Sequence, residues 1–86
     1  MFLNNVTRTV TKKVDATSVV PAIADETCNG RHTVWIYALD DVYIGGKDVT
    51  SDNGIKVSAG SHAIFPVNNR NAIYVVGGNC VIADFF

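Results

Sequence analysis

The sequence predicts one small all-β domain, an antiparallel β-sandwich or barrel with an extended N-terminal arm. Val (13) and Ile (7) are abundant among its 86 residues, whereas Leu occurs only twice and Glu once. Side chains branched at Cβ pack well on a pleated sheet, so this balance favours strands over helices. Eight Asn and seven Gly supply turns. Turn signals recur about every 8–12 residues, which is the spacing of a small sandwich or barrel.

The first 17 residues differ from the rest and are expected to form an extended arm or an edge strand, followed by a single β domain over 18–86. In an extended conformation, one face of this segment carries apolar and basic residues in turn: Val6, Arg8, Val10, Lys12 and Val14. Such a face is a poor core face. The segment also carries a net charge of +2, against −3 for the remainder. We therefore expect residues 1–13 to lie on another chain, with the edge strand as the alternative.

The domain itself is expected to contain short strands at 18–23, 33–39, 42–44, 55–57, 63–65, 72–76 and 80–86. Pro21 belongs at an edge or a strand end, and Pro66 is expected to stop its strand. Residues 33–39 are apolar on both faces, which is typical of a central strand or of one covered by a partner. The Gly77-Gly78-Asn79 sequence between the last two strands predicts a hairpin.

The cysteines and histidines do not form a recognisable site. Cys28 and Cys80 are expected to be free thiols, the first accessible in a polar loop and the second in the core. His32 and His62 both lie beside turns and lack the spacing of zinc ligands, so they are expected at the surface or its rim. We expect no metal site and no cofactor.

No catalytic motif is apparent either, and we expect no enzymatic activity. The adjacent Ser61 and His62 would point to opposite faces of a strand, and no nucleophile elbow is present. Gly45-Gly46-Lys47 lacks the Ser or Thr that follows Lys in a phosphate loop, so it is expected to be a bulge and turn. A weak loop-bound cation near residues 48–53 remains the open alternative.

Binding to another protein is the expectation that remains. The net charge of −1 and the isoelectric point near 6.0 argue against nucleic acid. No apolar run approaches the roughly 18 residues that span a membrane, and the start lacks the pattern of a signal peptide, so synthesis in a cytoplasm is expected.

Adjacent Phe85 and Phe86 would point to opposite faces, leaving one for a partner. The candidate interface residues are Phe2, Leu3, Val6, Arg8, Val10, Lys12, Lys13, Phe85 and Phe86.

A series of short motifs runs through the second half of the chain: Val42-Tyr43-Ile44-Gly45-Gly46, Asp48-Val49-Thr50, Asn53-Gly54-Ile55, Ala59-Gly60, Phe65-Pro66 and Ala72-Ile73-Tyr74. In this order they resemble a small β module of tailed-phage virion structural proteins. The resemblance implies a non-enzymatic capsid cement or decoration protein on the virion surface. It would bind the major capsid protein between shell subunits, as a homotrimer. The alternative is a receptor- or glycan-binding module of a phage fibre, neck or tail, and a small intracellular enzyme or regulator ranks third.

Overall fold

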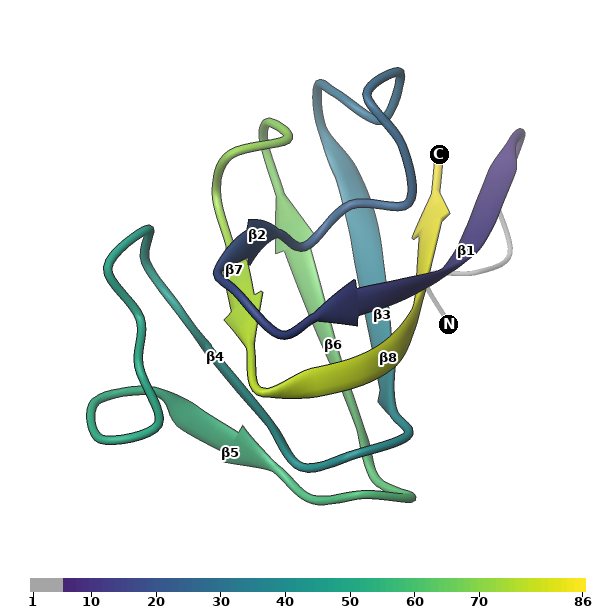
Figure 1. Cartoon of the computed structure of the whole chain (residues 1–86). Coiled ribbons are helices and arrows are strands. Elements are labelled where there is room, and N and C mark those ends of the chain that lie inside the picture. The colour runs from purple at the N-terminus through teal and green to yellow at the C-terminus, as the bar shows by residue number, and fades with distance from the viewer. Residues whose placement is uncertain (1–5) are drawn as a thin grey trace.

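Two four-stranded antiparallel sheets pack face to face in the computed structural model, which describes residues 6–86 (Figure 1). Sheet A has the order β1 (Thr9–Ala16), β8 (Gly78–Phe85), β3 (His32–Ala38) and β6 (His62–Val67). Sheet B has the order β2 (Val20–Pro21), β7 (Tyr74–Val76), β4 (Val42–Gly45) and β5 (Ile55–Val57). The all-β prediction is confirmed, and of its two forms the structure has the sandwich rather than a closed barrel. Within residues 6–86 there is no helix that could cross a membrane.

The core lies between the sheets and consists mainly of β-branched side chains. Burial alternates residue by residue along β3 and β8, so every second side chain points inward. The largest fully buried apolar side chains are Ile36, Ile82, Val34, Val42 and Val75. Each is worth roughly 1.5–3 kcal/mol when moved from water into the interior. The abundance of Val and Ile thus accounts for the core as well as for the strands.

The segment expected to be an arm is, from Thr9 onward, an edge strand of the domain's own sheet. Strand β1 pairs with β8 over its whole length, from Thr9 opposite Phe85 to Ala16 opposite Gly78. Ahead of it, Arg8 and Phe86 exchange backbone hydrogen bonds. The alternating face is adequate because only Val14 and Ala16 must meet the core, while Val10 is half-buried and Lys12 stays exposed. Residues 1–5, including Phe2 and Leu3, lie outside the described residues.

The predicted hairpin between the last two strands is wrong, because β7 belongs to sheet B and β8 to sheet A. The chain crosses between the sheets at Gly77, which has φ 126° and donates a backbone hydrogen bond to the carbonyl oxygen of Ala16. Beside it, the Asp40 carboxylate packs where a Cβ on Gly78 would lie, and it accepts the backbone N–H of Asn79 at 2.8 Å. These contacts direct the chain away from β7.

The two prolines lie where a missing N–H is tolerated. Pro21 is in β2, an edge strand of sheet B, as predicted. Pro66 does not stop its strand, because β6 continues to Val67. Since β6 is the other edge of sheet A, one side of it has no ladder partner and can accommodate a proline.

Candidate functional site

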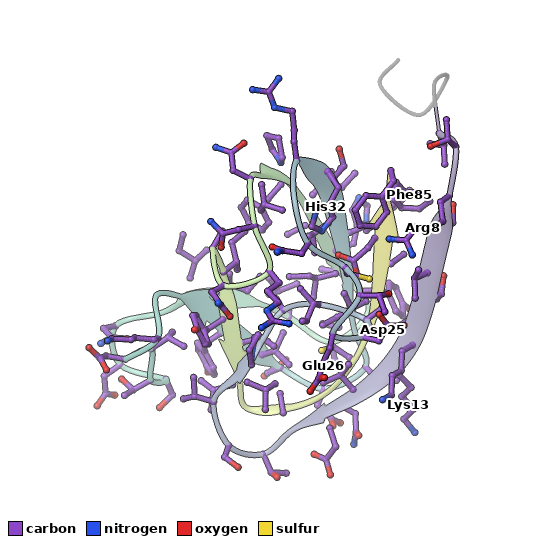
Figure 2. All side chains as sticks on the ribbon, turned by 90° about the horizontal axis from the view of Figure 1, so that it is seen from above. Arg8, Lys13, Asp25, Glu26, His32 and Phe85 are labelled. Carbon is purple, nitrogen blue, oxygen red and sulfur yellow. The ribbon has the colours of Figure 1, made fainter. Side chains whose placement is uncertain are left out.

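A buried polar cluster closes one end of the sandwich, where Arg8 lies near His32 (Figure 2). His32 on β3 is 5% exposed and Asp84 on β8 is fully buried. The expectation that His32 lies at the surface or rim is therefore wrong. Asp84 was missed by sequence reasoning, although Cys80, Ile82 and Asp84 alternate and so share the inward face of one strand.

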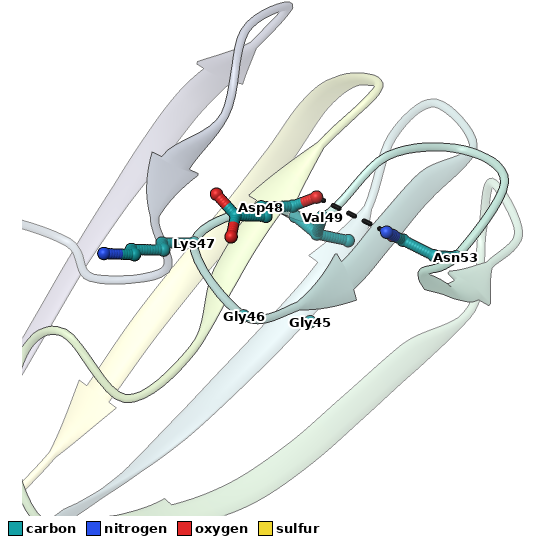
Figure 3. A pocket seen from close by; sticks show the side chains of 6 residues that line it. All are labelled: Gly45, Gly46, Lys47, Asp48, Val49 and Asn53. Carbon is teal, nitrogen blue, oxygen red and sulfur yellow. Dashed lines mark hydrogen bonds between the residues drawn. The ribbon is translucent and has the colours of Figure 1, made fainter.

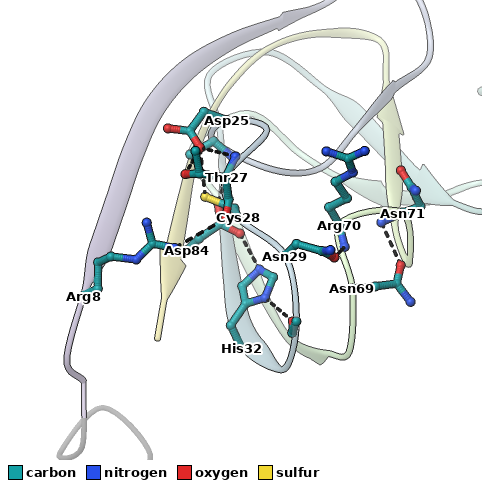
Figure 4. Close-up of polar contacts among 12 residues, drawn as sticks. Arg8, Asp25, Thr27, Cys28, Asn29, His32, Asn69, Arg70, Asn71 and Asp84 are labelled. Atoms are coloured by element: carbon teal, nitrogen blue, oxygen red, sulfur yellow. Dashed lines mark hydrogen bonds and ion pairs between the residues drawn. The ribbon is translucent and has the colours of Figure 1, made fainter.

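Every polar atom of this pair has a partner (Figure 4). The Nε2 atom of His32 lies 2.6 Å from Oδ1 of Asp84, and its Nδ1 lies 2.7 Å from the carbonyl oxygen of Gly30. Because a carbonyl oxygen only accepts, Nδ1 carries the hydrogen. The second carboxylate oxygen of Asp84 accepts the N–H of Ala24 at 2.7 Å. The pair thus ties the loop between β2 and β3 to the final strand.

Cys28 completes the cluster, and its predicted accessibility is wrong because the residue is fully buried. Its thiol lies 3.6 Å from Oδ1 of Asp25, and burial is the main cause that raises the pKa of Cys28. The hydroxyl and the N–H of Thr27 both donate to Asp25 and lower the pKa of that carboxyl group. Both nitrogens of His32 are already engaged, so the ring has no free lone pair to deprotonate the thiol.

The second thiol behaves as the sequence predicted. Cys80 is fully buried in the core, and burial raises its pKa to about 11. Both cysteines are free. Neither thiol therefore has the exposed, electropositive setting of a reactive cysteine.

Arg8 and Phe86, two of the candidate interface residues, contact their own chain. The ring of Phe86 stacks on His32 with centroids 4.5 Å apart and planes inclined by 20°. The guanidinium carbon of Arg8 lies 4.3 Å from the centroid of the Phe86 ring. Such a cation–π contact is worth roughly 0.5–1 kcal/mol where water has access. The ring of Phe86 therefore covers the buried His32–Asp84 pair, and the guanidinium group of Arg8 covers that ring.

The second site is an apolar surface, the outer face of sheet A, and Phe85 lies on it. Its centre consists of three rows that run across β8, β3 and β6: Phe85–Thr33–Pro66, Ala83–Trp35–Ile64 and Val81–Tyr37–His62. These nine residues contain no carboxylate, Lys or Arg. No described part of the chain covers them. We call these nine residues the outer patch.

Trp35 stands at the centre of the outer patch between two other rings. Its ring centroid lies 6.0 Å from that of Phe85 and 5.5 Å from that of His62. Beside it is a shallow hollow of about 380 Å³, lined by Trp35, Tyr37, His62, Val81 and Ala83. Tyr37 is 42% exposed. The apolar second face of residues 33–39 thus belongs to a central strand whose outward side is left uncovered by residues 6–86.

The other candidate interface residues lie elsewhere. Lys13 is at the rim of the outer patch, opposite Val81 on the edge strand β1. Val10 and Lys12 point to the other side of β1, and Val6 precedes the strand. The alternation of Asn79, Val81, Ala83 and Phe85 would have revealed the β8 half of the patch if the strand had been assigned its correct neighbours.

The loop from Gly45 to Asn53 forms a shallow hollow (Figure 3). The side-chain oxygen of Asn53 accepts the N–H of Thr50 at 2.7 Å, and its amide group donates to the carbonyl oxygen of Asp48 at 3.4 Å. Val49 is buried beneath the loop. No cluster of three or more His, Cys, Asp or Glu side chains occurs among residues 6–86. The polar groups of this loop hold its own conformation.

Comparisons with known proteins correct the functional prediction. No family model matches the chain, and no curated protein matches it. One solved structure does align, from Bacillus endospore appendages, a family of disulfide-linked pili. It has a TM-score of 0.44 and 22% identity, and the alignment covers 91% of this chain and 87% of that one. That structure is a spore appendage and not a phage virion protein, so the prediction of a capsid cement protein is wrong on this finding. The phage, capsid and homotrimer expectations lack support.

Proposed function

We propose that this chain is a non-enzymatic structural subunit that packs through the outer patch on another protein subunit. The observation that carries the proposal is the uncovered apolar face around Trp35, Tyr37 and Phe85. Monomeric proteins rarely expose a contiguous apolar patch of more than a few hundred Å² unless it serves as a contact surface. Four strands spaced about 4.8 Å apart and up to eight residues long give the whole outer face of sheet A roughly 500 Å², and the outer patch is its apolar part on β8, β3 and β6.

The chemistry of the patch favours a flat, uncharged protein surface as partner. Nucleic acid would need several cations on the face, whereas the β1 residues that border the patch are Thr9, Thr11 and the single cation Lys13. The centre offers few side chains that can donate or accept hydrogen bonds, namely those of Thr33, Trp35, Tyr37 and His62. Aromatic rings flanked by small apolar residues are typical of the central region of protein interfaces.

The buried cluster supports a role without catalysis. The thiol of Cys28 is inaccessible, and the ring of His32 has both nitrogens committed to hydrogen bonds. A nucleophile and its base need a reacting atom within reach of solvent or substrate. The cluster instead stabilises the end of the sandwich that carries Phe86 on one side of the sheet and Phe85 on the other.

The proposal can be tested with tagged full-length chain in its producing cells. Trp35→Asp should shift the chain from a large complex to the size of the free 9.2 kDa protein. Ile55→Asp is the matched control, because Ile55 is 67% exposed on β5, away from the outer patch. Circular dichroism should show that both variants fold. An unchanged complex size for folded Trp35→Asp would refute the proposed function.

A further inference from the structure

We infer that the outer patch binds a second copy of this chain, packed face to face about a two-fold axis that runs parallel to the strands between β8 and β3. This inference rests on the proposed function and names the partner of the same surface. In such a dimer β8 of one copy lies over β3 of the other, and the reverse holds by symmetry. The argument comes from the sizes of the side chains that the axis brings together.

Each row of the patch pairs a large side chain with a small one across that axis. Residues of β8 and β3 that are opposite in the sheet exchange places in the dimer, because the axis runs along the strands between them. Ala83 is opposite Trp35, Val81 is opposite Tyr37, and Thr33 is opposite Phe85. Trp35 of one copy therefore meets Ala83 of the other, and Tyr37 meets Val81. In the third row the large residue is on β8, and Phe85 meets Thr33.

This alternation makes the face self-complementary. The hollow between Trp35, Tyr37, Val81 and Ala83 can receive the ring that projects from the second copy. A two-fold axis perpendicular to the strands would instead place Trp35 on Trp35 and leave Ala83 against Ala83. That arrangement leaves a gap over one strand and a collision over the other, and interiors tolerate neither.

The edges of sheet A favour stacking over extension of the sheet. Strand β6 contains Pro66, which lacks a donor, and β1 carries Lys12 and Lys13, whose like charges would meet if two copies paired there. Charged residues and proline are common means of blocking edge pairing. Aligned sheets pack within about 30° of each other, so the pairing is closest in the central row, that of Trp35 and Ala83.

The size of the patch predicts a reversible dimer. Two copies of the whole outer face of sheet A, each roughly 500 Å² with the polar edge strand β1 included, bury at most about 1,000 Å² in total, which is the lower bound for a specific interface. The population of dimer should therefore rise with concentration. Trp35 is the sole tryptophan of the chain, so its fluorescence reports on the patch without labels. Its emission should shift to the blue, and quenching by acrylamide should fall, as the dimer forms.

The decisive test is a pair of complementary variants studied by sedimentation velocity. Trp35→Asp alone and Ala83→Lys alone should each weaken self-association by at least about tenfold, because each places an unpaired charge in both copies of the contact. Mixed in equal amounts, they should form a heterodimer. One contact then joins the new Asp to the new Lys, while the other keeps the original Trp35 and Ala83. Trp35→Asp mixed with Ile55→Lys is the control: Ile55→Lys should dimerise with itself, Trp35→Asp should stay monomeric, and the mixture should gain no heterodimer.

The outcomes separate this inference from the proposed function. Wild-type protein that stays monomeric up to about millimolar concentration, together with a complex in cells that depends on Trp35, would mean that the partner is a different protein. A wild-type dimer without heterodimer formation by the mixture would overturn the two-fold geometry. If either variant fails to fold, Tyr37→Asp with Val81→Lys tests the same axis in the neighbouring row.

Discussion

The Nε2 atom of His32 lies 2.6 Å from Oδ1 of Asp84, and both side chains are buried between the sheets. The carboxylate also binds the N–H of Ala24, so one side chain of the last strand holds two other segments. A buried polar group without a partner is costly, whereas one with all its partners specifies a single arrangement. This pair therefore determines how the long loop between β2 and β3 closes the sandwich.

Replacement of Asp84 should reveal whether its hydrogen bonds or its negative charge contribute more to the stability of the fold. In Asp84→Asn the amide oxygen can accept from Ala24 and the amide nitrogen can donate to Nε2 of a neutral ring, so every hydrogen bond is kept. We expect a loss of less than about 1.5 kcal/mol. Asp84→Ala leaves both groups without partners and should cost about 3–5 kcal/mol. Urea unfolding at pH 7 measures both. Equal losses would show that the ionic character of the pair dominates.

The buried thiol of Cys80 should make the protein less stable in alkali. Its pKa is about 11 in the folded chain, against an ordinary value of 9.0, because burial disfavours the thiolate. Because the pKa is raised in the folded chain, the neutral Cys80 thiol makes its full contribution to stability below pH 9 and loses it as the pH rises towards 11. Between pH 9 and 11 the free energy of unfolding should fall by about 1.4 kcal/mol per pH unit.

Cys80→Ala isolates this effect from the other groups that titrate in alkali. Urea unfolding with a reducing agent at pH 8, 9 and 10 should give a shallower decline for the variant than for the wild type. Parallel curves would mean that the thiolate is tolerated in the core.

Gly77 and Gly46 form a matched pair that tests the crossing between the sheets. Gly77 has φ 126°, and a Cβ there would lie 2.8 Å from the carbonyl oxygen of Asp41. Gly77→Ala should therefore destabilise the fold by at least about 1–3 kcal/mol. A Cβ on Gly46 meets nothing within 4 Å, so Gly46→Ala should be nearly neutral. Thermal unfolding compares them, and similar melting temperatures would contradict the observed crossing.

Proline substitutions can show which side of β1 faces its partner. Arg8 and Phe86 exchange both backbone hydrogen bonds, so the backbone groups of even-numbered residues in β1 face β8 and those of odd-numbered residues face the open edge. Lys12→Pro should remove a ladder hydrogen bond and cost about 3 kcal/mol or more. Thr11→Pro should cost much less, because its N–H points outward.

Denaturant unfolding of these two variants distinguishes an edge strand from an arm. Two variants with wild-type stability would mean that β1 does not contribute to the fold. Loss of stability in Thr11→Pro as large as in Lys12→Pro would reverse the assignment of the open edge.

The strands were largely predictable because alternation and turn residues act over short distances. Residues 42–44 and 55–57 were assigned within one residue of β4 and β5. Pairing was harder, since the Gly-rich connection after Val76 is compatible with either a hairpin or a crossing. The choice depends on Asp40, which is distant in sequence and packs against Gly78. The burial of His32 was missed for the same reason, because its partner Asp84 lies more than 50 residues away.

By itself the sequence determined the fold class, the thin core of Val and Ile, and the apolar character of both faces of residues 33–39. These follow from side-chain shape and from the two-residue period of a strand. Only the tertiary structure decided which strands are neighbours. That choice made residues 9–16 an edge strand, enclosed the His32–Asp84 pair, and set a small side chain beside a large one in each row of β8 and β3. The physical reason is that register and sheet membership arise from contacts between distant residues, which no local pattern encodes.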